Sequence, residues 1–205
     1  MGSHSVGRPT SQPDPARPIG YPADLERQLR LNDGRLVFVR PVVPTDIDDL
    51  REAIVVADEQ TLRDRFLGMH PSLTESDLHR LTEVDFQSRL ALAAFDEESS
   101  GVAIARYEGK PGEDVAEVAI VVDPDWRRVG LASRLLAMLA EAAVERGLRR
   151  FTAVYLVGNE VVEGLVRASG LPKTCRVSFG VTEVEINLTP LAEGAPLGGS
   201  VAPEG

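Results

Sequence analysis

The chain has 205 residues, 43% hydrophobic and 26% charged, which is enough for one domain with a core but too little for two ordinary domains. Acidic residues outnumber basic ones by 32 to 22, so the formal net charge is −10. Such a surface repels nucleic acids and anionic membranes, and no apolar run approaches the roughly 20 residues that a transmembrane helix needs. We expect no nucleic-acid or membrane partner. Because the first 20 residues lack the apolar segment of a signal peptide, we expect a cytoplasmic protein.

Cysteine and histidine usage argues against metal and thiol chemistry. Cys175 is the one cysteine, so it cannot form an internal disulfide or build a thiolate zinc site, and we expect no bound metal. None of the three histidines pairs with it in a recognisable motif. A small buried thiol is therefore favoured over a nucleophile at this position.

The two ends of the chain differ in composition from the middle. Residues 1–20 and 192–205 are rich in proline, serine and glycine and hold few large apolar side chains. Such segments bury too little apolar surface to offset the entropy lost on ordering. We predict flexible tails at 1–20 and 192–205 around one folded domain that covers residues 21–191.

The folded part opens with a strand and a helix. A strand is predicted at 35–42, after an Asn-Asp-Gly turn at 32–34. A helix follows to about residue 57, with Thr45 as its N-cap. Asp46 and Asp48 lie in its first turn, where the helix dipole favours acidic side chains.

The rest of the domain alternates strands and helices in an order typical of mixed α/β proteins. Three apolar strands joined by short turns predict an antiparallel meander, and a strand–helix–strand crossover follows it. The long helix after the meander has a wide apolar face at helical spacing. The predicted helices lie at 59–66, 74–81, 130–147 and 160–169, and the strands at 89–95, 101–108, 115–122, 150–156, 175–179 and 182–188.

The loop after the third meander strand carries the strongest chemical signal. It holds Arg127, Arg128 and Gly130, and a helix begins at once. Main-chain N–H groups at a helix start have no internal partner and the helix dipole is positive there, so this junction suits a diphosphate. Gly130 allows close approach, Ala132 is small and Ser133 adds a hydroxyl donor. An ordinary strand-to-helix turn with solvated arginines is the alternative.

At this point the sequence resembles a known family. Residues 127–132, RRVGLA, match the pattern R/Q-x-x-G-x-G/A of the acyl-CoA pyrophosphate loop in the GNAT superfamily of N-acetyltransferases. Asn159, which opens a later helix, is similar to the family's second cofactor segment. The order of elements over 35–188 also resembles the GNAT fold. The resemblance implies an α/β (α+β) fold with a mixed, mostly antiparallel twisted sheet of about seven strands flanked by about four helices.

The resemblance narrows to one group. The stretches DGRLVFVRPVVPTD, LRDRFLG, LTEVDFQSRLALAAF, AEVAIVV and GVTEVEINL are similar to the catalytic domain of bacterial Pat-type protein lysine acetyltransferases. Some of those proteins carry a cyclic-nucleotide-binding domain and others a large acyl-CoA-synthetase-like domain. The chain is too short for either, so we expect a catalytic domain alone, without cyclic-nucleotide control. Arg128-Val129 replaces the Gly-Arg of many members, which removes one glycine from the loop.

The family's cofactor contacts map onto this sequence. Its pantetheine arm pairs with strand backbone just before the pyrophosphate loop, where neighbouring strands splay apart and unpaired N–H groups can stabilise an oxyanion. Asn159 is the candidate side-chain contact to pantetheine, and a plain helix N-cap is its alternative. The resemblance implies acetyl-CoA contacts from Ile120, Val121, Val122, Arg127, Arg128, Val129, Gly130, Leu131, Ala132, Ser133 and Asn159.

Glu117 is the candidate general base. It interrupts an apolar strand three residues before Ile120. A lysine amine has a pKa of about 10.4, so it must lose a proton before it can attack a thioester. A carboxylate on a sheet face beside a cofactor cleft is expected to be partly desolvated, and the resemblance implies that Glu117 takes this proton. The alternative is a solvent-facing strand carboxylate without a catalytic role.

A general acid is harder to place. Many GNAT enzymes have a tyrosine in the helix after the asparagine, whereas Val161, Val162 and Leu165 occupy that stretch here. A CoA thiol is acidic enough that no dedicated acid is required. Tyr155 on the preceding strand is favoured as a core residue, and Trp126 as a residue that packs over the loop.

These observations predict an N-acetyltransferase. We expect transfer of an acetyl group from acetyl-CoA to the ε-amine of a protein lysine, by direct attack in a ternary complex, in a monomer or homodimer. A small amine such as an aminoglycoside, polyamine or amino acid is the alternative acceptor, and acidic side chains converging on the acceptor cleft would favour it. A non-catalytic acyl-CoA-binding sensor is the alternative without chemistry.

Overall fold

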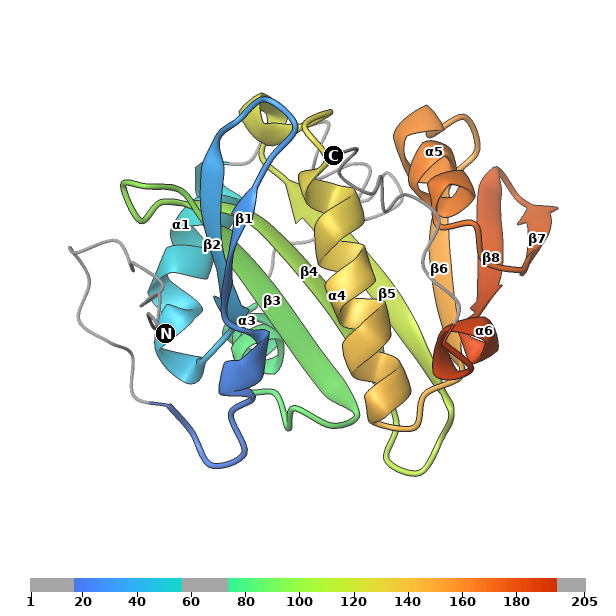
Figure 1. Ribbon diagram of the computed structural model, residues 1–205, viewed down its shortest axis with the longest axis horizontal. Coiled ribbons are helices and arrows are strands. Elements are labelled where there is room, and N and C mark those ends of the chain that lie inside the picture. Colours follow the sequence, from blue (N-terminus) through green and yellow to red (C-terminus); the bar gives the residue numbers. More distant parts are fainter. Residues whose placement is uncertain (1–16, 57–73, 195–205) are drawn as a thin grey trace, which may run out of the picture.

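The computed structural model describes residues 17–56 and 74–194. The helix predicted at 59–66 and most of both predicted tails lie outside these ranges. An eight-stranded sheet runs through the molecule in the order β1-β2-β3-β4-β5-β6-β8-β7 (Figure 1). The strands are β1 (Arg27–Arg30), β2 (Leu36–Pro41), β3 (Arg89–Phe95), β4 (Gly101–Gly109), β5 (Val115–Val122), β6 (Arg150–Leu156), β7 (Lys173–Ser178) and β8 (Val181–Asn187).

Each neighbouring pair of strands is antiparallel except β5 and β6. Short turns join β3, β4 and β5, so these strands alternate in direction, whereas the path from β5 to β6 passes through a helix and returns in the same direction. The predicted meander, crossover and final hairpin are therefore confirmed. The sheet has one strand more than expected.

Helices cover both faces of the sheet. In Figure 1, α4 crosses the near face. On the opposite face, Arg80 of α3 hydrogen bonds to Glu108 of β4. Within the described ranges, no helix has the length and apolarity needed to cross a membrane. The α-helices are α1 (Ile47–Val56), α3 (Glu75–Thr82), α4 (Leu131–Glu145), α5 (Glu160–Ala168) and α6 (Thr189–Ala192), with 3₁₀ helices at Ala23–Leu25, Pro44–Asp46 and Pro124–Trp126.

The main core lies between α4 and the sheet. Leu131, Leu135 and Leu139 recur at the same face of α4 and are buried against the central strands. Ala116 of β5 belongs to the same cluster. Because strand side chains alternate between faces, the neighbouring Glu117 points to the face away from α4. The core thus fixes the direction in which the candidate base projects.

The start of α1 differs from the prediction. Thr45 does not cap the helix, because it lies inside the 3₁₀ helix Pro44–Asp46 that precedes α1. The Asp46 side chain is buried, and its carboxylate is held by specific hydrogen bonds rather than by an interaction with the dipole of α1. Its carboxylate accepts hydrogen bonds from Arg40 Nη1 at 2.7 Å and Nη2 at 2.8 Å, and from the Val43 N–H at 2.9 Å. Asp46 therefore forms a buried ion pair with Arg40 of β2, and this pair links the start of α1 to the sheet.

Two further expectations were wrong for reasons of sheet position. Cys175 is exposed rather than buried, because β7 is the edge strand of the sheet and its residues from Lys173 to Val177 are exposed. Strand β1 was not predicted, because its sequence RQLR has no apolar run. It exists through its pairing with β2, where Leu29 lies opposite Val37.

Candidate active site

Strands β5 and β6 separate part-way along their length. Their pairing runs through Val115↔Arg150 and Ala116↔Phe151 and ends at Glu117↔Thr152, although both strands continue. Figure 1 shows them diverging toward the end of the sheet where α4 begins and where α5 lies. The sheet therefore opens immediately beyond Glu117, at the position where the family resemblance implied a splay.

The open edge of β5 presents main-chain groups from alternate residues. The Asp123 N–H donates to the Val102 C=O on β4 at 3.0 Å. Because main-chain groups alternate between the two edges of an antiparallel strand, those of Ile120 and Val122 point into the opening. Arg127 Nε donates to the Val122 C=O at 3.1 Å, which agrees with this direction. Val121, opposite Ile104, faces β4 with its main chain.

The loop from β5 to α4 is built on two residues with left-handed backbone. The Asp123 carboxylate accepts the Asp125 N–H at 2.9 Å and begins the 3₁₀ helix that ends at Trp126. Arg128 has a φ of 61° and Gly130 a φ of 84°. Arg128 therefore occupies a conformation that glycine adopts at no steric cost, at the place where many members of the resembled group have glycine.

The N-terminus of α4 is open to an anion. Gly130 is its N-cap residue and supplies no side-chain cap, and the first turn contains no acidic residue. Leu131 is 1% exposed, so its side chain belongs to the core and its main-chain N–H is what it can offer a ligand. Ala132 is half-buried and Ser133 is exposed. With Arg127 and Arg128 alongside, this terminus has the charge and the donors that a diphosphate needs.

Glu117 is exposed and stands directly opposite Glu108 of β4. Glu108 accepts hydrogen bonds from Arg80 Nε at 2.7 Å and Arg106 Nη1 at 2.6 Å. Burial raises the pKa of Glu108, but the two arginines lower it by more than burial raises it. The pKa of Glu108 therefore lies below its ordinary value. Glu117 makes no hydrogen bond or ion pair with any residue of the described ranges. The part of the chain that the structure describes therefore does not provide the expected partial desolvation of Glu117.

Asn159 caps α5. Its Oδ1 accepts the Val162 N–H at 3.1 Å, which is the N-cap interpretation left open by the sequence. The cap uses the oxygen, so the Nδ2 amide group is the donor that this side chain can offer to pantetheine. Tyr155 is 5% exposed in the main core, and burial is the largest cause that raises the pKa of its phenol. It is a core residue, as expected.

Comparisons with known proteins agree with this geometry. A family model described as "Acetyltransferase (GNAT) family" matches residues 57–170. The chain belongs to the GNAT acetyltransferase family. It is therefore an acetyltransferase, and both the resemblance and the fold class expected from the sequence are confirmed.

Individual relatives include Pat proteins. The chain is 30% identical over 143 residues to acetyltransferase PA5475 of Pseudomonas aeruginosa, covering 68% of this chain and 77% of that one. It is 28% identical over 167 residues to acetyltransferase Pat of Mycolicibacterium smegmatis, covering 80% of this chain and 49% of that protein, about half its length. The solved GNAT domain of S. lividans PAT superposes with a TM-score of 0.75 at 31% identity, covering 82% of this chain and 99% of that one.

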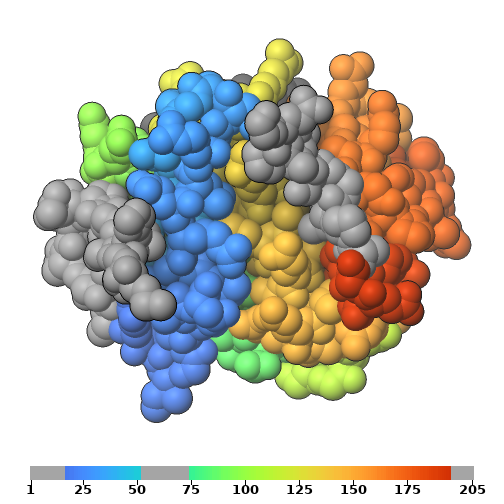
Figure 2. All heavy atoms as spheres, in the orientation of Figure 1, coloured from blue at the N-terminus to red at the C-terminus, as the bar shows by residue number. Residues whose placement is uncertain are grey.

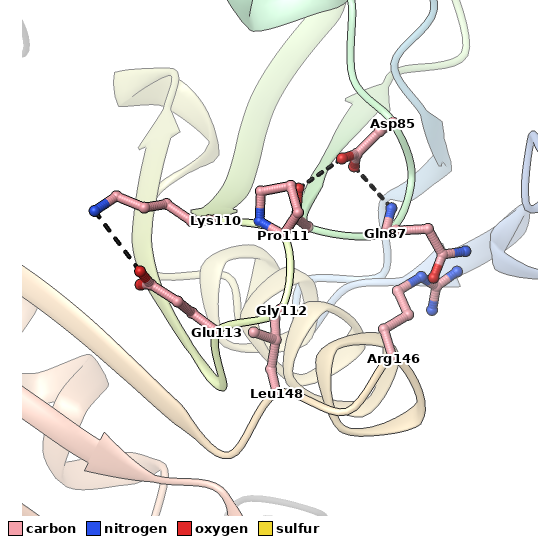
Figure 3. Close-up of a pocket in the computed structure, with 9 residues that line it drawn as sticks. Asp85, Gln87, Lys110, Pro111, Gly112, Glu113, Arg146 and Leu148 are labelled. Carbon is pink, nitrogen blue, oxygen red and sulfur yellow. Dashed lines mark hydrogen bonds and ion pairs between the residues drawn. The ribbon is translucent and has the colours of Figure 1, made fainter.

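A hollow with a volume of about 230 Å³ lies near the C-terminal end of α4, away from the loop that begins this helix (Figure 3). Its charged groups are already paired within the protein. Lys110 Nζ lies 3.7 Å from Glu113, and Arg146 Nε donates to the Phe86 C=O at 2.7 Å. Nothing there calls for a ligand. The residues that line it are Asp85, Gln87, Ser88, Lys110, Pro111, Gly112, Glu113, Arg146 and Leu148.

Sequence reasoning missed the contacts that the first hairpin makes with the α4 loop. The Asn32 N–H donates to the Val129 C=O at 3.1 Å, and Arg35 Nη2 donates to the Asp125 C=O at 3.1 Å. The Asn-Asp-Gly turn signal located the hairpin but carries no information on what the hairpin touches. Across residues 17–56 and 74–194, no group of histidine, cysteine and acidic side chains is arranged to hold a metal ion.

Proposed function

We propose that this acetyltransferase moves the acetyl group of acetyl-CoA to the ε-amine of a protein lysine by direct attack in a ternary complex, with Glu117 as general base. One observation carries the proposal: β5 and β6 stop pairing at Glu117↔Thr152. Glu117, which has no hydrogen bond or ion pair within residues 17–56 and 74–194, stands where the opening begins, and the N-terminus of α4 lies toward its open end. Thioester and amine can meet between them.

The residues of this region fit the chemistry of acetyl-CoA. The main-chain N–H groups of residues 131–133 and the cations of Arg127 and Arg128 suit its diphosphate. The main-chain groups of Ile120 and Val122, which point into the opening, suit the amides of its pantetheine arm. The Asn159 amide on the far side of the opening can add a donor. We infer that the diphosphate lies at α4 and that the thioester end reaches toward Glu117.

Glu117 would act on the proton of the incoming amine. Acetyl-CoA supplies the acetyl group as a thioester. The Glu117 carboxylate accepts the ammonium proton, directly or through water, and the free amine then forms a carbon–nitrogen bond as the carbon–sulfur bond breaks. The electron pair of that bond leaves with the thiolate of CoA, and the second proton that nitrogen loses as the amide forms goes to this thiolate, directly or through water. The Ile120 N–H, directed into the opening, is the donor in reach of the developing oxyanion.

The exposure of Glu117 supports a macromolecular acceptor. An exposed carboxylate becomes desolvated only when the acceptor itself covers the opening, and a protein surface can do this better than a small amine. The pairing of Glu108 with Arg80 and Arg106 supports the same view. If Glu108 were uncompensated, two negative charges would lie side by side near the acceptor amine, which would favour a small polycationic acceptor. Resemblance to the Pat-type catalytic domain agrees with a lysine acceptor.

The test is an acetylation assay with wild type and Glu117→Gln on a panel of lysine-containing proteins and a panel of small amines. We expect proteins to be acetylated by wild type and the variant to be strongly impaired. Turnover of small amines alone would replace the lysine proposal with the small-amine one. Binding of CoA without turnover of any amine, with the variant indistinguishable from wild type, would support a sensor.

A further inference from the structure

The β1–β2 hairpin lies against the loop that begins α4. In Figure 1 the tip of this hairpin reaches the segment just before α4, and Figure 2 shows its blue strands flanking the yellow helix on one side. The Asn32 N–H donates to the Val129 C=O at 3.1 Å, one residue before the N-cap Gly130. This contact fixes the C-terminal end of the loop.

Arg35 of the same hairpin fixes the other end of the loop. Its guanidinium lies 4.0 Å from the centroid of the Trp126 ring, and its Nη2 donates to the Asp125 C=O at 3.1 Å. Arg35 is itself oriented by Asp33, whose carboxylate accepts from Arg35 Nε at 2.6 Å. A planar guanidinium that stacks on an indole and hydrogen bonds at its edge is more restrained than a lysine at the same position would be.

The Asn32 side chain lies directly over Gly130. A Cβ atom placed on Gly130 would be 2.9 Å from Asn32 Nδ2 and 3.1 Å from Oδ1. A Cβ at this position would displace the exposed Asn32 amide, and the φ of 84° is what makes glycine the favoured residue. Asn32 is exposed overall, so its amide lies at the edge of the α4 N-terminus, within the surface that would face a diphosphate.

The two anchors enclose the strained part of the loop. Arg128, with its φ of 61°, lies between Trp126 on one side and Val129 on the other. A non-glycine residue keeps a left-handed backbone only where the surroundings determine it, since this conformation costs about 1–2 kcal/mol. The hairpin supplies part of those surroundings, alongside the hydrogen bond from Arg127 Nε to the Val122 C=O. We expect the loop to relax when the hairpin contacts are removed.

We propose that Asn32 and Arg35 are positioning residues that hold the diphosphate-binding loop in its ligand-ready shape. This inference rests on the proposed function, because it needs the loop to bind the diphosphate of acetyl-CoA. The hairpin does not touch the reacting atoms. Its effect is therefore on affinity for the acyl carrier, and the rate of the chemical step is unaffected.

The probe is coenzyme A, titrated into the full chain by calorimetry and by the fluorescence of Trp126, which is the one tryptophan. For Arg35→Ala we expect the Kd for CoA to rise about tenfold, the effect of losing roughly 1.4 kcal/mol of loop ordering, with unchanged stoichiometry. The Trp126 emission should shift to longer wavelength, because its ring loses the guanidinium that covers it.

Asn32→Asp provides a second test, in which the side chain keeps its shape and the hairpin contacts are not removed. The aspartate has the same shape, and its negative charge near the N-terminus of α4 should raise the melting temperature of the ligand-free protein slightly. The same charge occupies the place of the diphosphate, so the Kd for CoA should rise by about tenfold. Opposite shifts in stability and affinity would show that the Asn32 side chain lies beside the diphosphate site, whereas Arg35→Ala tests the positioning role itself.

Arg30→Ala is the matched control, because Arg30 lies on the same hairpin and reaches the Gly34 C=O at 3.5 Å rather than the loop. It should bind CoA like wild type. If wild type itself does not bind CoA, the proposed function fails. If wild type binds and Arg35→Ala binds equally well, the hairpin has no positioning role. A reduced stoichiometry at unchanged Kd would also overturn it.

Discussion

Glu117 and Glu108 face each other across the β4–β5 pair, on the face of the sheet away from α4. Two carboxylates in direct cross-strand positions repel each other. Arg80 and Arg106 compensate the charge of Glu108 with hydrogen bonds at 2.7 Å and 2.6 Å. The compensation is therefore unequal: one carboxylate is held by two arginines, and the other projects into solvent at the point where the strands part.

Replacing Glu117 by Gln should lower kcat about 100-fold at neutral pH, because general-base catalysis contributes about 10²–10⁴-fold. The loss should shrink as pH rises toward the amine pKa of about 10.4, where the acceptor deprotonates without help. Steady-state rates from pH 6 to 10 measure this, with CoA affinity as the control for an intact fold. Equal pH profiles for the two proteins would remove Glu117 from the mechanism.

Replacing Glu108 by Gln should lower activity through its effect on Glu117. The change releases Arg80 and Arg106, and Glu117, opposite Glu108 on the adjacent strand, already interacts electrostatically with Arg80. An arginine paired with Glu117 makes it a weaker base, so kcat should fall several-fold while the KM for acetyl-CoA stays constant. Arg80→Gln combined with Glu108→Gln should recover part of the rate. If the double variant is no faster than Glu108→Gln, Glu108 does not act by keeping Arg80 away from Glu117.

The same variant gives a stability test with a defined pH dependence. The pKa of Glu108 is lowered by Arg80 and Arg106 in spite of burial. A lowered native-state pKa adds stability above the ordinary carboxyl pKa, and this stability is lost as pH falls through the lowered value. Wild type should therefore exceed Glu108→Gln by about 1 kcal/mol at pH 7. Urea unfolding at pH 7 and pH 3 should show the difference shrinking at the acidic pH.

Arg128→Gly should stabilise the protein relative to Arg128→Ala. Both variants remove the cation, but only glycine adopts a φ of 61° without strain. The strain relieved is about 1–2 kcal/mol and the entropy lost by glycine about 0.5–1 kcal/mol, so we expect a difference of about 1 kcal/mol in the free energy of unfolding. Urea denaturation measures it. A more stable alanine variant would mean that the loop is not held in the left-handed conformation.

Asp46→Ala should be the most destabilising of these changes. It leaves Arg40, which is 4% exposed, as an unpaired buried cation, and breaking a buried pair typically costs about 3–5 kcal/mol. Replacing both partners, as Arg40→Met with Asp46→Leu, should restore much of the loss because no buried charge remains. Urea unfolding of the single and double variants checks this. Loss of less than 1 kcal/mol for Asp46→Ala would show that water reaches the arginine.

Local patterns in the sequence were sufficient for the central elements. The strands β3, β4 and β5 and the helix α4 follow directly from apolar alternation, short turns and helical periodicity. The position of the loop before α4 also follows from local sequence, because the pattern R-x-x-G-x-A couples a cation, a glycine and a small residue to a helix start. Each of these signals lies within a few neighbouring residues, so the chain alone contains the information.

Contacts between distant segments could not be predicted in this way. Arg35 and Asp125 are 90 residues apart in the sequence, and the residues around either one do not indicate that the two are in contact. The residues around Asp46 predict that it lies in the first turn of a helix and interacts with the helix dipole. In the structure its carboxylate pairs with Arg40 of β2 instead. The exposure of Glu117 depends on which helices cover which half of the sheet. That is a property of the assembled fold.

The short contact between β5 and β6 has a mechanical consequence. Only three residue pairs join these strands, so the halves of the sheet on either side share backbone hydrogen bonds at one end alone. Elsewhere along these strands, the contact between α4 and α5 joins the two halves through side chains instead of backbone hydrogen bonds. Substitutions between those two helices should therefore change the separation of β5 and β6 more readily than substitutions within the paired ends of the strands.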